Sequence, residues 1–92
     1  MEVLASYLND GWVPNLSQHR QAPALAALGG TIRRLRKSRG ISQEKLALMA
    51  DVDTSYVGRV ERGDNNVAIL TLIKIAEALE ITLSELMTEA EL

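Results

Sequence analysis

The chain of 92 residues lacks cysteine altogether and contains a single histidine. Without cysteine, neither a disulfide nor a zinc site with thiolate ligands can form, which fits a reducing cytoplasm. The lone His19 has no second metal ligand beside it and no nucleophile paired with it, so a metal site or a catalytic triad is not expected. Apolar runs of about 18 residues are absent too, as is the pattern of a secretory signal. We therefore expect a cytoplasmic protein that spans no membrane.

Motifs of enzymes and cofactor sites are also missing or broken. Gly58 and Gly63 have the spacing of the glycines in a phosphate-binding loop, but Asp64 and Asn65 follow where lysine and serine or threonine are needed. No strand pattern precedes the loop, and the scattered carboxylates do not have the order of a calcium-binding loop. We expect a protein that is not an enzyme and that holds no metal or cofactor.

Charge is distributed unevenly along the chain. The net charge is −2, yet residues 31–63 contain eight lysines and arginines against four acidic residues, a local balance of +4. Residues 64–92 carry one lysine against six acidic residues, a balance of −5, and residues 1–30 contribute −1. Binding to nucleic acid requires positive potential at the contact surface and not a basic protein overall. The pattern assigns the central third of the chain to DNA.

This central third contains two short helix patterns separated by a tight turn. In residues 42–50, Ser42 can act as the N-cap, and Leu46, Ala47 and Ala50 share one apolar face. In residues 53–62, Asp53 is the expected N-cap, and Gly63 follows where helices commonly end in left-handed geometry.

The second of these helices has two contrasting faces. Its expected buried residues are Tyr56, Val57 and Val60. Its other residues are small, polar or basic: Thr54, Ser55, Gly58, Arg59 and Arg62. Two helices joined by a short turn, with a polar and cationic face on the second, are typical of the helix-turn-helix of DNA-binding proteins.

Three further helices are predicted around this motif. One covers residues 24–38, with Pro23 suited to its first turn, and another covers residues 68–79. A last short helix is capped by Ser84 and ends at Met87, and residues 88–92 are expected to fray. Residues 23–92 thus form one all-α domain, and residues 1–22 form an N-terminal arm.

Residues 40–47, 55–63 and 72–79, in this order and spacing, resemble the Cro/Xre (lambda-repressor-like) family of bacterial and phage DNA-binding domains. The resemblance extends over residues 28–87, about two thirds of the chain. It implies a compact five-helix domain that binds operator DNA as a dimer.

The resemblance also implies roles for individual residues. Gln43 matches a glutamine that hydrogen-bonds the DNA backbone and braces the recognition helix. Thr54, Ser55 and Arg59 match positions that read bases, and arginine can engage guanine O6 and N7 together. Arg36 and Glu61 match an internal ion pair that serves structure and not DNA contact.

Other candidate contacts follow from the residues themselves. Arg62 is expected to reach a phosphate. Gly58 costs helix stability of about 1 kcal/mol, so we interpret it as allowing close approach to the groove. Tyr56 has two interpretations, because its ring can pack inward while its hydroxyl reaches a phosphate.

The chain departs from the family pattern at three places. Asp51 and Glu80 stand where glycine is usual, and Asp64 with Asn65 replaces basic residues after Gly63. The last change is expected to weaken contacts with the DNA backbone.

A homodimer is expected because one recognition helix reads too few base pairs for a selective site. The apolar residues proposed for its interface are Leu70, Ile73 and Met87. A competing arrangement places Trp12, Val13 and Leu16 of the arm over Leu70 and Ile73 within one chain.

Two functions therefore remain open from the sequence. The first is a dimeric, sequence-specific transcriptional regulator that binds double-stranded DNA, such as a phage repressor or a restriction–modification controller, which residues 61–67 resemble. The alternative is an antitoxin-type module that neutralises a protein partner and regulates its own promoter. The arm at residues 1–22 distinguishes them, since a different protein bound there would favour the second.

Overall fold

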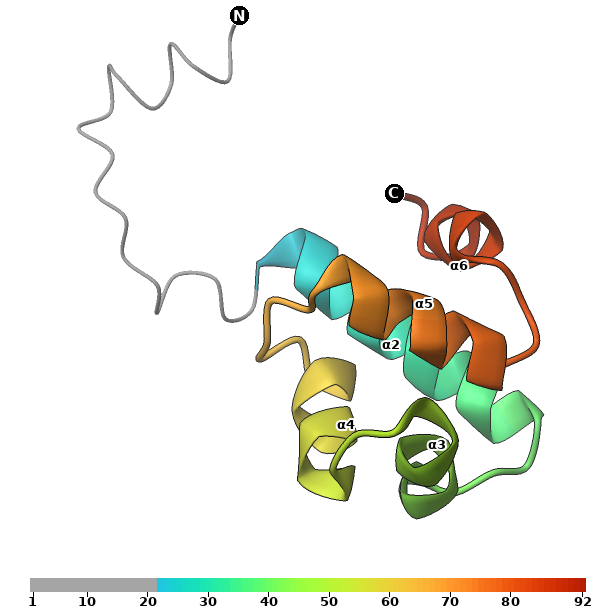
Figure 1. Ribbon diagram of the computed structural model, residues 1–92. Helices are drawn as coiled ribbons and strands as arrows, with labels where there is room; N and C mark the ends of the chain where they lie inside the picture. The colour runs from blue at the N-terminus through green and yellow to red at the C-terminus, as the bar shows by residue number, and fades with distance from the viewer. Residues whose placement is uncertain (1–21) are drawn as a thin grey trace, which may run out of the picture.

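The computed structural model describes residues 22–92, which fold into five α-helices (Figure 1). The helices are α2 (Pro23–Ser38), α3 (Gln43–Ala50), α4 (Thr54–Glu61), α5 (Ile69–Ala78) and α6 (Leu83–Glu89). Helix α3 packs against both α4 and α5, α2 packs against α4 and α6, and α5 packs against α6. The predicted all-α class and five-helix architecture are confirmed over this part of the chain.

Every helix contributes at least one almost fully buried aliphatic side chain to a single core. These side chains are Ile32, Leu46, Val57, Ile75 and Leu86, each no more than 1% exposed. Burial of one such side chain contributes about 1.5–3 kcal/mol. Because these five side chains meet in one core, the rest of the domain fixes α3 and α4 relative to each other.

The ends of the two central helices follow the predicted pattern with one exception. Ser42 accepts a hydrogen bond from the Lys45 amide at 3.0 Å, as an N-cap should. Asp53 occupies the N-cap position of α4, but its side chain makes no capping hydrogen bond there. Gly63 has the expected left-handed geometry, with φ at 77°. Asp51 and Glu80, which replace the glycines usual in the family, have φ of 58° and 62°.

The prediction for the C-terminal helix is wrong at both ends. Thr82, and not Ser84, caps α6: its hydroxyl accepts from the Glu85 amide, while the Glu85 carboxylate accepts from the Thr82 amide. The bonds from the backbone and the side chain of Thr82 lower the pKa of Glu85. This contribution to stability is therefore present above the ordinary pKa of glutamate and is lost as the pH falls through the lowered value. The helix runs to Glu89 and not to Met87, and Ala90 after it is buried, so fraying is not expected to begin at Thr88.

Gly29 allows α2 to approach the end of α4 very closely. A Cβ atom at Gly29 would lie 2.1 Å from the carbonyl oxygen of Val60 and 2.8 Å from that of Glu61. The neighbouring Gly30 is exposed, and a Cβ there would meet nothing within 4 Å. Only the first glycine is therefore required by packing, and it determines where the last turn of α4 lies.

Several predictions concern residues that the structure does not describe. Residues 1–21 of the arm lie outside the described residues, and with them Trp12, Val13, Leu16 and His19. The predictions that the arm covers α5 or binds a protein partner therefore stay predictions. Between residues 22 and 92, no helix has both the length and the apolar character needed to cross a membrane.

Candidate nucleic-acid interface

The outward face of α4 presents small, polar and cationic side chains. Ser55, Arg59 and Arg62 are exposed, and Thr54 is half-buried at the start of the helix. Val57 and Val60 face the core on the opposite side. The structure thus places the predicted base-reading and phosphate-binding side chains together on one side of the helix.

Tyr56 lies between the core and this outward face. Its ring packs partly against the core, and the guanidinium carbon of Arg59 lies 5.7 Å from the ring centroid. At this distance a guanidinium is attracted to the negative face of an aromatic ring. Tyr56 therefore supports the Arg59 side chain, a role that was not predicted from the sequence.

A buried ion pair fixes the last turn of α4 to α2. The Nε of Arg36 donates to Oε2 of Glu61 at 2.6 Å, and Nη2 donates to Oε1 at 3.0 Å. Their side chains are only 8% and 2% exposed. The Glu61 bond raises the pKa of Arg36, although burial acts in the opposite direction. Arg36 also donates from Nη1 to the Ile41 carbonyl at 2.9 Å, so it ties the turn before α3 to the same point.

Gln43 extends this network to the first residue of α3. Its Nε2 donates to Oε1 of Glu61 at 3.0 Å. A carboxylate can only accept, so the amide nitrogen of Gln43 must face Glu61. The second hydrogen on that nitrogen and the unpaired amides of the first turn of α3 remain available to an acceptor such as a phosphate.

Beside Gln43, a hollow of ≈ 240 Å³ opens between α2, α3 and α4. It is lined by Arg33, Gln43, Gly58, Glu61 and Arg62. The charge of Glu61 is already balanced by Arg36, so the two arginines make the hollow positive. A Cβ at Gly58 would lie 3.2 Å from Nη1 of Arg62, which means that the Arg62 side chain extends across this glycine. Arg33 reaches this hollow because α2 packs beside α4.

Helix α5 exposes a different kind of surface. Leu70 is 70% exposed and Ile73 is 36% exposed, as their positions off the core face predict. Ile69 is also 56% exposed, although it was not predicted to lie in the interface. Met87 packs partly against the domain's own core, so it offers less surface to a partner than predicted.

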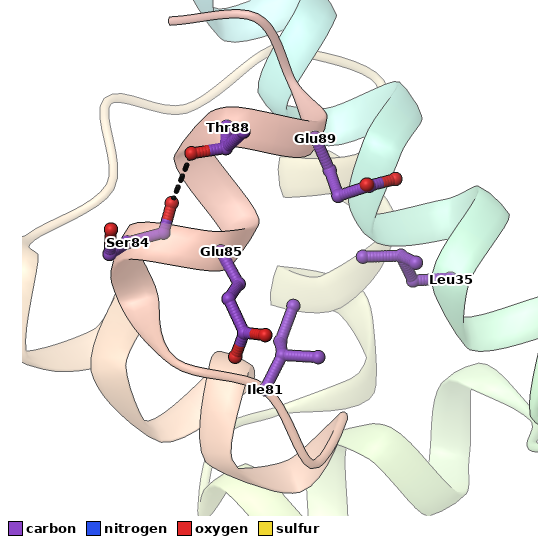
Figure 2. A pocket seen from close by; sticks show the side chains of 6 residues that line it. All are labelled: Leu35, Ile81, Ser84, Glu85, Thr88 and Glu89. Carbon is purple, nitrogen blue, oxygen red and sulfur yellow. Dashed lines mark hydrogen bonds between the residues drawn. The ribbon is translucent and has the colours of Figure 1, made fainter.

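A second hollow lies between α2 and α6, away from these residues. Figure 2 shows Leu35 of α2 opposite Ile81, with Glu85 and Glu89 of α6 at its edge. Glu89 accepts from Arg34 at 3.0 Å. The carboxylates of Glu85 and Glu89 make this hollow unsuitable for a phosphate, in keeping with the negative charge balance of residues 64–92.

The model of the helix-turn-helix family matches residues 32–86. The chain belongs to this family. The matched segment begins inside α2 and ends inside α6. It includes both helices of the helix-turn-helix and the residues of the buried network. The predicted Cro/Xre-type relationship is confirmed.

Two relatives are control proteins. The control protein C.MunI from Mycoplasma sp is 41% identical over 64 residues, which cover 68% of this chain and 86% of that protein. The control protein C.SmaI from Serratia marcescens is 38% identical over 61 residues, covering 66% and 73% of the two chains.

Solved structures of two regulators are also similar to this chain. The restriction-modification controller protein C.AhdI from Aeromonas hydrophila is 47% identical, with a TM-score of 0.66 over 67% of this chain and 94% of that one. The clp gene regulator ClgR from Corynebacterium glutamicum is 28% identical, with a TM-score of 0.72 over 74% and 72%. The chain is a DNA-binding transcriptional regulator.

Proposed function

We propose that this regulator binds a two-fold operator as a homodimer, with α4 of each subunit in the major groove. The observation that carries the proposal is the outward face of α4, where cationic and small polar side chains lie beside the positive hollow. Thr54, Ser55 and Arg59 would contact base edges, and arginine would select guanine. Gly58 is buried beneath the Arg62 side chain, so we propose that it leaves room for that arginine, and not for direct contact with the groove as the sequence predicted.

The buried network supports separate contacts to the DNA backbone. Gln43 is held by Glu61 with one amide hydrogen free, and Arg62 lies at the edge of the same hollow. Both would donate to phosphates, as would the Tyr56 hydroxyl. Phosphate contacts fix orientation and register, while base contacts determine sequence.

The exposed apolar residues of α5 support the homodimer. Ile69, Leu70 and Ile73 belong to the outward side of a helix whose other side is already buried in the core. Isolated monomers rarely expose contiguous apolar surface of this kind without function. A two-fold dimer would place two copies of α4 about one helical turn of DNA apart.

Among regulators, a restriction–modification controller is the best match. Three relatives named as control proteins and the structure of C.AhdI support this class, as does the resemblance of residues 61–67. Such a protein would act by binding alone, in the cytoplasm of a bacterium or an infected cell, where its DNA lies.

Selection of duplexes from a random pool, followed by affinity measurements at several salt concentrations, tests the proposal. We expect an enriched two-fold sequence and affinity that falls steeply with salt, because phosphate contacts release counterions. Arg62→Ala should reduce the salt slope by about one unit per subunit, or about two for the dimer. Arg34→Ala, which removes a charge paired with Glu89 away from α4, should leave the slope unchanged. A wild-type affinity independent of salt would contradict the proposal.

A further inference from the structure

The Arg62 side chain is already paired within the chain. Its Nε donates to Oδ2 of Asp64 at 3.1 Å. Left-handed Gly63 turns the backbone between them, and the Asp64 amide donates to the Arg59 carbonyl at 2.9 Å. The aspartate is therefore presented from a hydrogen-bonded backbone, whereas the arginine side chain is 63% exposed and free to exchange partners.

A carboxylate and a phosphate are equivalent partners for a guanidinium. Both accept charge-assisted hydrogen bonds from its nitrogen atoms, and each can occupy the donors that the other needs. Here the guanidinium extends across Gly58 at the edge of the positive hollow while its Nε is held by Asp64. The guanidinium has five N–H donors, and a phosphate that bound its Nε side would have to compete with the Asp64 carboxylate.

We infer that Asp64 is an internal competitor for the Arg62 guanidinium and thereby lowers the affinity of the interface for DNA phosphates. The inference rests on the proposed phosphate contact of Arg62. In free protein the ion pair must loosen before Arg62 binds DNA, and in the complex an unpaired carboxylate lies close to the phosphate. Exposed ion pairs are weak, so Asp64 tunes binding and does not prevent it.

Because a phosphate contact is independent of sequence, this competition affects every duplex. A duplex of arbitrary sequence, about 20 base pairs long, at low salt is therefore a sufficient probe, and no operator is needed. The double-mutant cycle comprises the wild type, Arg62→Ala, Asp64→Asn and the double variant. Asp53→Asn is a matched control, since Asp53 is an exposed aspartate at the N-cap of α4 whose side chain makes no capping hydrogen bond.

We expect Asp64→Asn to bind this duplex about five- to tenfold more tightly than the wild type, because it removes both the competition and a repulsive charge. In the Arg62→Ala background the same change should improve binding only about twofold, which is the effect of charge alone. Asp53→Asn should also improve binding about twofold. All variants should melt within a few degrees of the wild type, because none removes a buried contact.

An equal gain from Asp64→Asn in both backgrounds would overturn the inference, because Asp64 would then act as a charge and not through Arg62. No gain in the wild-type background would overturn it as well. These results differ from failure of the proposed function, in which the wild type itself would bind no duplex and the inference would fall with it.

Discussion

Helices α4 and α5 are consecutive in the chain and bury one face in the same core, yet their outward faces have opposite chemistry. The buried apolar side chains of α4 are Val57 and Val60, and those of α5 are Leu72, Ile75, Ala76 and Ala78. The outward side of α4 is polar and cationic, whereas that of α5 carries Ile69, Leu70 and Ile73. Since burial does not constrain these outward residues, they support the proposed partners: phosphates and bases for α4, a second apolar surface for α5.

The two helices are also fixed to the domain by different means. The last turn of α4 is held by the ion pair of Arg36 and Glu61, the Gln43 hydrogen bond and the close contact at Gly29. Helix α5 buries Leu72, Ile75, Ala76 and Ala78, all apolar. Directional hydrogen bonds fix orientation more tightly than apolar contacts do, and a base-reading helix requires fixed orientation.

Ile73→Asp tests the role assigned to α5 and should have the largest effect on DNA binding. A charge in the proposed interface should give a folded monomer, with operator affinity reduced about 10²–10⁴-fold because two linked half-sites become one. Sedimentation and binding to the selected operator measure this. Leu48→Asp, at a 76% exposed leucine on α3, is the control and should remain dimeric. A dimeric Ile73→Asp variant with reduced stability would instead favour cover by the arm.

Arg36→Ala tests how α4 is fixed. It leaves the Glu61 carboxylate buried without its main partner, so the free energy of unfolding should fall by about 3–5 kcal/mol. Arg34→Ala, on the same helix, removes an exposed pair with Glu89 and should cost at most about 1 kcal/mol. Urea unfolding measures both variants. Equal losses would show that the buried network does not stabilise α4.

Gly29→Ala and Gly30→Ala form a matched pair at adjacent positions of α2. At Gly29 the new methyl group would collide with the carbonyl oxygens of Val60 and Glu61, so we expect a loss of about 1–3 kcal/mol or more. At Gly30 the methyl group meets open space, and alanine should stabilise the helix by about 0.5–1 kcal/mol. Thermal unfolding should therefore shift in opposite directions, and shifts of the same sign would contradict the close contact.

Local signals in the sequence predict most of the fold. Apolar spacing locates all five helices, the Ser42 hydroxyl predicts the start of α3, and Gly63 predicts the end of α4. Family resemblance, and not spacing, led to the pairing of Arg36 with Glu61, because the two are far apart in sequence. Thr82 was missed as a cap because Ser84 offers the same hydroxyl, and only the backbone decides between them.

The features that could not be predicted all depend on contacts between segments. Gly29 and Gly30 are identical in sequence terms, and only the crossing of α2 over α4 distinguishes them. Arg33 becomes part of the hollow because α2 lies beside α3 and α4. The pairing of Arg62 with Asp64 depends on the left-handed turn at Gly63. Met87 has apolar character, which suits a core or an interface equally well.

The central claim is that α4 reads sequence through Arg59 and binds the backbone through Arg62. Affinities of Arg59→Ala and Arg62→Ala for the selected operator and for a scrambled duplex test it most directly. Arg59→Ala should lose about 1–3 kcal/mol on the operator only and relax the preference at one base pair in each half-site. Arg62→Ala should weaken both duplexes alike. A uniform loss for Arg59→Ala across the two duplexes would contradict the account, because Arg59 would then contact the backbone and not a base.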